Sequence, residues 1–357
     1  MKTYKKFIIF LFIKSFFYIF LIIFGLVIII NLFSELDFFK NLNVSSYYPL
    51  LMTLINSPSL LFDMFPFIFL MSTQLFFINL FNNDEIKIFK YNGLKNSSII
   101  RLISITSFIL GLFIISLYYN FSSSLKNIYL ELKSNYTSDG KYLAVITKNG
   151  LWIKDKINDS TLIINASRFA DNYLIDTFIS EFDNNFKIIK NISSSKIDIK
   201  ENLWIIENPK IFAQNEIRSI DHLKIKTNFN FQKIKNLFSN LSSLSLIDLI
   251  ELKKNYSEIG NSLVEINLQI QKILSYPIYL SLMTILSSII MFNSKKIKRS
   301  NIKITVGLFF CVIIYYVNNF FNVLGSTEKI SITMSIWIPV TIICLINFVL
   351  IRNINEK

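Results

Sequence analysis

Histidine and cysteine are scarce in this 357-residue chain, which has one histidine and two cysteines. His222 by itself makes neither a metal site nor a Ser-His-Asp arrangement, because each needs further partners. Cys311 and Cys344 both lie inside apolar runs. Cysteine in such a run behaves as a small hydrophobic side chain, so no disulfide framework is expected.

Sequence motifs for catalysis and ion pumping are missing as well. The nucleotide-binding pattern G-x-x-x-x-G-K-[ST] is not met, since Gly140-Lys141 is followed by Tyr142 and Asn135 stands in place of the first glycine. Paired carboxylates are absent from the apolar runs, which argues against a proton-relay pump. We therefore expect no catalytic residue, no cofactor and no metal site, and we expect any transport to be driven by another subunit.

Long hydrophobic runs are what the chain has in abundance, with 52% of its residues hydrophobic. A helix needs about 20 consecutive apolar residues to cross a bilayer. Six stretches approach or reach that length, at residues 16–33, 59–81, 99–121, 273–292, 302–324 and 334–351. The first is read as a span and not as a signal peptide, because Ser34-Glu35-Leu36-Asp37 after it is no small-residue cleavage site. The predicted fold is an α-helical membrane protein with six spanning helices.

The net charge of +13 would suggest a nucleic-acid partner, but its distribution points to membrane topology instead. The N-terminus, the Asp84–Arg101 connection, the 293–303 loop and the tail together hold 15 Lys and Arg residues. The short loops on the other side hold only Lys40 and Lys329. Because basic loops stay in the cytoplasm, both termini are predicted to be cytoplasmic. No nucleic-acid partner is needed to explain the charge.

The stretch from Ser122 to Lys272 is predicted to lie outside the cytoplasm and to be mainly β-structure. Hydrophobic residues alternate with polar ones through its middle, and Asn149-Gly150 and residues 183–185 are turn signals. About eight short strands of this kind are typical of a sandwich or jelly roll. Ser245 can cap a helical return segment that follows. The predicted division is 1–121 for the first transmembrane half, 122–272 for the external domain and 273–357 for the second half.

The connection after the second run predicts a short cytoplasmic helix, at about residues 84–92. Asn82 can cap it with Glu85 at the third position, and Gly93 suits a left-handed C-terminal residue. One interpretation is a helix lying on the membrane surface. The other is a peg that docks in a groove of a cytoplasmic partner. Asp63, near the start of the second run, is a functional candidate as an ionisable residue in a span, but the favoured interpretation is a first-turn carboxylate that suits the helix N-terminus.

Four local patterns, taken in order, resemble the LptF/LptG permeases of lipopolysaccharide export, and LptG more than LptF. They are the Glu85…Gly93 helix, the segment Asn149-Gly-Leu-Trp-Ile-Lys-Asp155, the prolines Pro58 and Pro66, and Gly325 followed by Trp337-Ile-Pro339. The resemblance covers essentially the whole chain. It implies that the inserted domain is a jelly roll and that the protein is half of an ABC-type exporter in the bacterial inner membrane.

Partners and site residues follow from the same resemblance. It implies an LptF-like permease partner, a cytoplasmic LptB-type ATPase dimer, an LptC-like periplasmic jelly-roll protein and lipopolysaccharide as the cargo. It implies that Glu85 contacts the ATPase and that Ile86, Phe89 and Gly93 shape the docking helix. Lys40, Tyr315 and Phe320 are the candidate lipid-contacting residues. The family often carries lysines at the outer end of span one, whereas residues 31–38 here have only Lys40 nearby.

Two other functions remain open at this stage. A non-transporting sensor or scaffold could use the β domain to bind an envelope partner, and its depletion would leave lipid export unchanged. A lipid-modifying enzyme is the third possibility, but the sequence offers no cluster of His, Cys or carboxylates at the bilayer surface.

Overall fold

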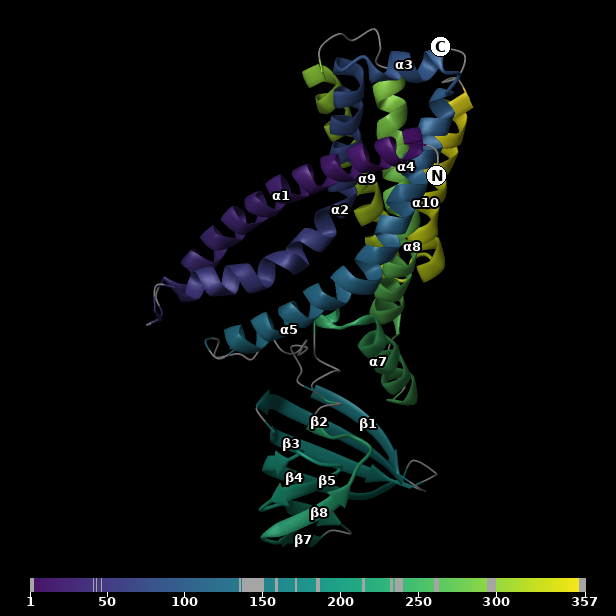
Figure 1. Cartoon of the computed structure of the whole chain (residues 1–357). Helices are drawn as coiled ribbons and strands as arrows, with labels where there is room; N and C mark the ends of the chain where they lie inside the picture. Colours follow the sequence, from purple (N-terminus) through teal and green to yellow (C-terminus); the bar gives the residue numbers. More distant parts are fainter. Residues whose placement is uncertain are drawn as a thin grey trace. The chain divides into compact units, whose positions relative to one another are not determined.

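The computed structural model describes residues 3–352 except 41, 43, 46, 135, 137–150, 158–159, 171, 184–186, 214–215, 232–233, 235–239, 260–262 and 294–299. Its helices are α1 (Thr3–Phe39), α2 (Tyr48–Asn82), α3 (Glu85–Tyr91), α4 (Asn96–Phe113), the π-helix η1 (Ile114–Tyr119), α5 (Asn120–Ser134), α7 (Leu246–Ile259), α8 (Val264–Asn293), α9 (Ser300–Ser326) and α10 (Ile332–Arg352) (Figure 1). Residues 1–126 with 267–357 form one compact unit, and residues 127–266 form another.

Six helical segments in the described chain are long and apolar enough to cross a membrane, which confirms the predicted spans. Several are longer than predicted. Helix α1 has 37 residues, or about 55 Å, against a hydrocarbon core of about 30 Å. The third span continues through η1 and α5 to Ser134, past the predicted end at residue 121. The polar residues after Phe121 keep helical structure because a helix outside the bilayer does not need an apolar sequence.

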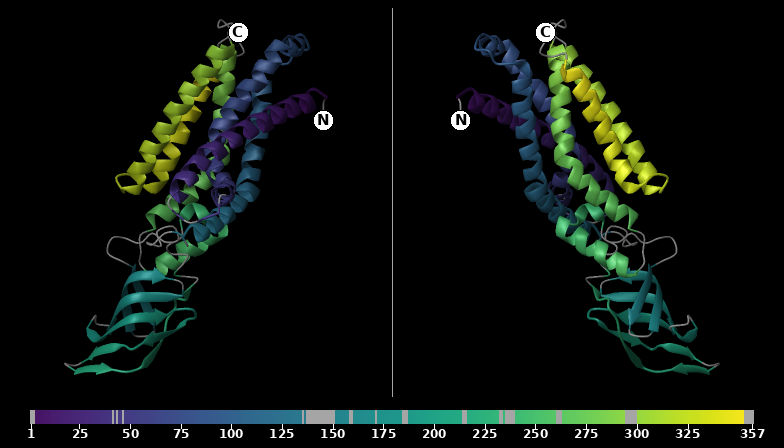
Figure 2. Two further views of the ribbon diagram at one scale, coloured as in Figure 1. Left: turned by 90° about the vertical axis from the view of Figure 1, so that its left-hand side faces the viewer. Right: turned by 90° about the vertical axis from the view of Figure 1, so that its right-hand side faces the viewer.

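Helix α2 lies at the centre of this helical unit, because it packs against both α1 and α9. Helices α9 and α10 run side by side (Figure 2). A buried apolar cluster joins α2, α8, α9 and α10 through Leu70, Leu282, Met283, Leu286, Cys311, Ile314, Val340 and Ile343. Cys311 therefore packs as a small hydrophobic side chain, as the sequence predicted, and Cys344 is exposed; neither forms a disulfide.

The prolines of the spans lie inside helices, and a neighbouring helix compensates for one of them directly. Pro66 has no N–H, so the carbonyl of Phe62 four residues earlier loses its helical donor. The hydroxyl of Tyr276 in α8 donates to that carbonyl. Helix α2 begins at Tyr48, so the interpretation of Asp63 as a first-turn residue is wrong. Asp63 instead pairs with Lys272 of α8, with 3.2 Å between Oδ1 and Nζ.

The second unit contains an antiparallel sheet, which confirms the predicted all-β domain inserted between spans three and four. Its strands are β1 (Leu151–Ile157), β2 (Ser160–Ala170), β3 (Tyr173–Phe182), β4 (Ile188–Asp198), β5 (Leu203–Glu207), β6 (Lys210–Ala213), β7 (Glu216–Ser219) and β8 (His222–Lys226). Neighbours follow the order β1-β2-β3-β4-β5-β8, and β6 pairs with β4 and β7. The predicted turn at Asn149-Gly150 lies outside the described residues, and β3 and β4 flank the predicted turn at 183–185.

Alternation along the strands builds the core of this domain. Ile153, Ile164, Ile179 and Ile192 are buried and lie opposite one another across β1 to β4. Period two puts alternate residues on one face, and that face is the apolar one. The indole N–H of buried Trp204 donates to the carbonyl of Phe229, which follows β8 (2.8 Å). The residues after β8 therefore close over the inner face of the sheet.

A buried carboxylate ties the first strand to the residues after the last one. Asp155 of β1 is 2% exposed, and it accepts hydrogen bonds from the backbone N–H (2.9 Å) and the side-chain amide (2.8 Å) of Asn228. The Asp155–Asn228 pair links the two ends of the sheet, because β1 and β8 stand at opposite ends of the strand order.

Ser245 caps α7 as predicted, through reciprocal hydrogen bonds with Asp248.

Removing the Asp155–Asn228 pair is expected to destabilise the β domain. Asp155→Ala removes the acceptor that both the backbone N–H and the side-chain amide of Asn228 use, and a hydrogen bond to a charged group is worth about 1.5–3 kcal/mol. We expect a loss of about 3 kcal/mol in the opening free energy of β1, measured by amide hydrogen exchange on the full chain in detergent. Asp198→Ala is the control, because among the described residues this half-buried carboxylate accepts a local hydrogen bond, from the N–H of Lys200 two residues on. Equal protection in both variants would contradict the role given to Asp155.

Candidate functional site

Helix α3 is a separate two-turn helix between α2 and α4, as the sequence predicted. Its C-terminus is a Schellman motif, in which the N–H of Gly93 bonds to Lys90 and that of Leu94 to Phe89, both at 2.9 Å. Gly93 has φ +78°, so the predicted left-handed position is confirmed. The N-terminus differs from the prediction. Asn82 is the last residue of α2, and Asp84, with φ +57°, precedes α3.

The predicted capping box is therefore wrong. Glu85 is the first residue of α3 and not its third, and no side-chain hydrogen bond caps this end. Because Asp84 is left-handed, the chain turns sharply there and α3 begins only at Glu85. Asn82 still belongs to α2, so it cannot cap α3. Asparagine and aspartate adopt this conformation more readily than other non-glycine residues. The break between α2 and α3 is thus a turn held by backbone geometry.

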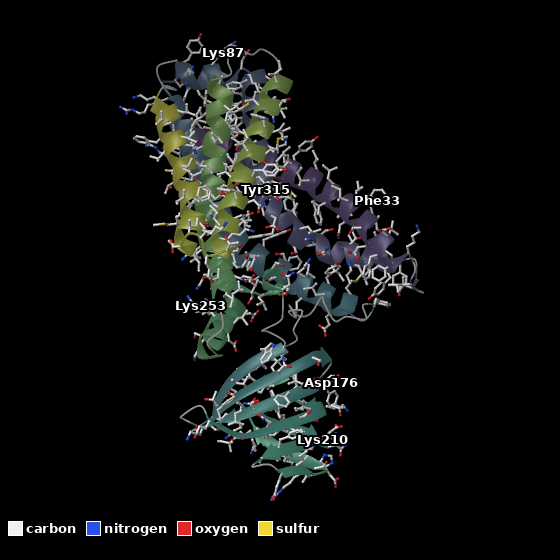
Figure 3. All side chains as sticks on the ribbon, turned by 180° about the vertical axis from the view of Figure 1, so that it is seen from behind. Phe33, Lys87, Asp176, Lys210, Lys253 and Tyr315 are labelled. Carbon is white, nitrogen blue, oxygen red and sulfur yellow. The ribbon has the colours of Figure 1, made fainter. Side chains whose placement is uncertain are left out.

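The two faces of α3 differ in exposure. Ile88 is 57% exposed and Tyr91 is 90% exposed, and they lie three residues apart on one face. Lys87, which Figure 3 labels, is also exposed and precedes Tyr91 by four residues, one helical turn. We call Lys87, Ile88 and Tyr91 the α3 face. Large apolar side chains exposed on so short a helix are typical of a contact surface.

The residues that the resemblance assigned to docking lie mostly on the other side. Glu85, Ile86 and Phe89 are half-buried. The ring of Phe89 meets that of Phe7 in α1 edge-on, with 6.2 Å between the centroids. Phe89 therefore anchors α3 to α1. Sequence reasoning missed Tyr91 because a helix of seven residues gives too few turns to decide which face is covered.

Charges around α3 are arranged with the helix. Lys87 Nζ lies 2.7 Å from Asp84 Oδ1, and this hydrogen bond raises the pKa of Lys87, which stays positively charged at neutral pH. Glu85 in the first turn suits the helix N-terminus. Its Oε2 is buried, and no donor among the described residues is within hydrogen-bond distance. A buried carboxylate oxygen without a donor is costly, so this oxygen favours a hydrogen-bond donor beyond the described residues.

The candidate lipid-contacting residues lie on exposed helix surfaces. Tyr315 is 64% and Phe320 61% exposed on α9, and Lys40 is exposed just after α1 (Figure 3). Helices α1 and α9 are the least buried of the six spanning segments. Tyr315 and Phe320 are five residues apart and lie on different sides of α9, so Tyr316, not Tyr315, shares the side of Phe320. No described contact joins Lys40 to either of them.

A polar network that sequence reasoning missed lies at the far end of the helical unit, the end away from α3. The side-chain amide of Asn56 in α2 donates to Asn31 in α1 (3.1 Å), and Lys126 in α5 donates to the same amide of Asn56 (2.7 Å). Asn31 also donates to the backbone of Thr53. Hydrogen bonds of this kind hold helices together where apolar contact alone is not selective. The polar residues stood in the sequence, but only the structure shows them facing one another.

An apolar groove of about 370 Å³ lies beside η1. Phe16, Leu110, Phe113, Ile114, Leu117, Tyr118 and Phe121 line it. Apart from the tyrosine hydroxyl, these side chains are apolar, so the groove suits hydrocarbon. Within the described part of the chain, no three His, Cys, Asp or Glu side chains gather closely enough to hold a metal ion.

Comparison with known proteins agrees with this architecture. The chain matches the family model described as "Lipopolysaccharide export system permease LptF/LptG" over residues 6–353. No curated protein matches it. The matched range includes α3, the spanning segments and the β domain. The chain belongs to the LptF/LptG family of lipopolysaccharide export permeases.

Proposed function

We propose that this chain is the LptG-type permease of an ABC exporter that extracts lipopolysaccharide from the bacterial inner membrane. The observation that carries the proposal is α3, a short helix fixed at its C-terminus and against α1, with an exposed apolar face. A chain without a nucleotide-binding motif needs such a surface to receive energy from an ATPase. Membership of an export permease family supports the same role.

The α3 face is proposed as the surface that docks in an LptB-type ATPase dimer. Ile88 and Tyr91 supply apolar contact area, and Lys87 supplies a charge at the rim. Glu85 contacts the ATPase at the edge of this face, while Phe89 and Gly93 hold the helix in position. Half-buried Ile86 shapes the same helix on its covered side. This orientation puts α3 and both termini in the cytoplasm, in accord with the 15 basic residues of the same segments.

The exposed surfaces of α1 and α9 are proposed to face an LptF-like permease partner and the lipid. Phe320 and Tyr315 contact acyl chains, and Lys40 lies where an anionic headgroup passes. The external domain, residues 122–272, then hands the lipid to an LptC-like jelly-roll protein. Residues 1–121 and 273–357 act as the two transmembrane halves around this insertion.

Depletion in a lipopolysaccharide-producing cell tests this function against the sensor or scaffold alternative. An export permease predicts that lipopolysaccharide accumulates in the inner membrane as the chain is lost. A sensor or scaffold predicts unchanged export. Normal lipopolysaccharide delivery in fully depleted cells would therefore refute the proposal.

A further inference from the structure

Two helices of the first unit change direction at the same level. Helix α2 bends between an oblique first half, which follows α1, and an upright second half that leads to α3 (Figure 1). The third span bends where α4 gives way to α5 (Figure 1). Pro58 and Pro66 lie inside α2, and the π-helix η1 joins α4 to α5. Prolines and π-helical turns are the usual causes of such bends, and π-turns recur at functional sites.

Side chains of η1 connect the two bends. The hydroxyl of Tyr118 donates to the carbonyl of Pro58 at 2.9 Å. Its ring meets that of Phe65 edge-on, with 5.0 Å between centroids, and the ring of Tyr119 lies 5.0 Å from that of Phe62. The extra residue of a π-turn rotates the side chains that follow it. Two successive tyrosines can thereby face the same stretch of α2.

A third tyrosine, Tyr276 of α8, contacts the same stretch of α2. The hydroxyl of Tyr276 donates to the carbonyl of Phe62, the group that Pro66 leaves without a helical donor. The two rings stack with 4.8 Å between their centroids. Residues 58–66 of α2 are thus held by two hydroxyl groups from two other helices. At Phe62 the hydroxyl replaces the helical N–H that Pro66 lacks, whereas Phe62 itself still has an N–H for the carbonyl of Pro58.

The parts of α2 on either side of residues 58–66 are fixed to different neighbours. Before Pro58, Asn56 joins Asn31 of α1 and Lys126 of α5. After Pro66, the carbonyl of Leu70 accepts from Ser287 of α8 (2.9 Å), and Gln74 donates to the backbone of Lys303 in α9 (2.9 Å). The interhelical hydrogen bonds of the two parts thus go to different helices, although rings of α1 also pack against the second part, at Phe69 and Phe76. Because proline interrupts the hydrogen bonds of a helix, bending in α2 is concentrated near Pro58 and Pro66.

We propose that residues 58–66 of α2 and η1 form one joint that moves during transport, and that Tyr118 and Tyr276 are its positioning residues. The inference rests on the proposed function, because it assigns the joint to lipid export. Movement at α3 passes along the upright half of α2 to this joint. There it changes the angle of the first half of α2, and of the end of α1 that Asn31 ties to it, relative to α9, which opens or narrows the surface between Phe33 and Tyr315 (Figure 3).

Distance measurements on the complete complex with its partner permease and ATPase test the joint. Spin labels at Phe33→Cys and Tyr315→Cys, in a Cys311→Ala, Cys344→Ala background, report the separation of α1 and α9. Tyr118→Phe and Tyr276→Phe each remove one interhelical hydrogen bond, which shifts a two-state balance about threefold in a membrane protein. We expect such a shift in the populations of the distances, together with less lipopolysaccharide exported per ATP hydrolysed.

Two further variants make the test sharper. Pro66→Ala returns an N–H to the carbonyl of Phe62, so it should stiffen the joint and narrow the distance distribution. Tyr47→Phe removes a hydroxyl from an exposed residue at the start of α2 and should change nothing. Wild-type distance distributions in Tyr118→Phe, Tyr276→Phe and Pro66→Ala alike would overturn the joint. The wild-type complex could export no lipid while the variants still shifted the distances between α1 and α9 as expected. That result would refute the proposed function but support the joint.

Discussion

Ile88→Asp is expected to weaken binding of the ATPase at least about 30-fold, the effect of losing one hot-spot residue worth about 2 kcal/mol. Ile88 is more than half exposed and touches little of its own chain, so its replacement should leave the fold intact. Docked in a groove, however, an aspartate would be buried without a partner. Co-purification of the ATPase subunit from membranes measures the effect, and Tyr91→Ala should reduce recovery in the same direction.

A matched control keeps this prediction specific. Ile250 in α7 is exposed to a similar extent on a short helix, so Ile250→Asp should leave recovery of the ATPase unchanged. Gly93→Pro is an independent test, because proline has no N–H to bond to Lys90 and cannot adopt φ +78°. It should lower recovery by disordering the end of α3. Full recovery from Ile88→Asp, Tyr91→Ala and Gly93→Pro would remove the docking role from α3.

The second large effect is expected at Gly111, where the third span meets α8. A Cβ atom there would lie 2.9 Å from Cα of Pro277, so any side chain forces two backbones apart. Small residues at such crossings allow the close approach on which membrane helix packing depends. We expect Gly111→Leu to cost about 3 kcal/mol, the upper part of the range for overpacked cores. Thermal unfolding in detergent should show a clear fall in Tm.

Gly25 provides the comparison. A Cβ atom at this position in α1 would meet nothing within 4 Å, so Gly25→Leu has room for its side chain. A leucine in place of a mid-helix glycine also lowers the intrinsic cost of helix formation. We expect Gly25→Leu to keep or raise the Tm. A similar fall in both variants would mean that the close approach of Gly111 and Pro277 does not stabilise the fold.

Hydrophobic length and alternation made the main architecture predictable from the sequence. Six apolar runs of about 20 residues specify spanning helices because a helix satisfies its own backbone in lipid. Alternation of apolar and polar residues specified the inserted sheet. The ends of the helices were not predictable in this way. Polar sequence after Phe121 carries no apolar signal, yet it continues as helix to Ser134. The interpretation of Asp63 failed for the same reason, since α2 begins well before its apolar run.

The candidate site was predictable only in part. Composition predicted α3 as a helix. Gly93 predicted where it ends, because a left-handed glycine depends only on the local chain. Which side chains of α3 face outward depends on the packing of Phe89 against Phe7, a contact between residues far apart in sequence. The roles of Tyr118 and Tyr276 could not be predicted from the sequence either. A π-turn leaves no simple sequence pattern, so the contact of Tyr118 with Pro58 could not be foreseen. A hydroxyl that replaces the missing N–H of a proline, as Tyr276 does for Pro66, can come from any neighbouring helix.

Reconstituted transport tests the central claim most directly. The chain, its partner permease and the ATPase would be placed in proteoliposomes that contain lipopolysaccharide, and transfer of lipid to a soluble jelly-roll acceptor would be followed after addition of ATP. We predict ATP-dependent transfer that requires this chain and is lost with Ile88→Asp. A complex that hydrolyses ATP in the presence of lipopolysaccharide but transfers none, or transfers it equally without this chain, would contradict its assignment as an export permease.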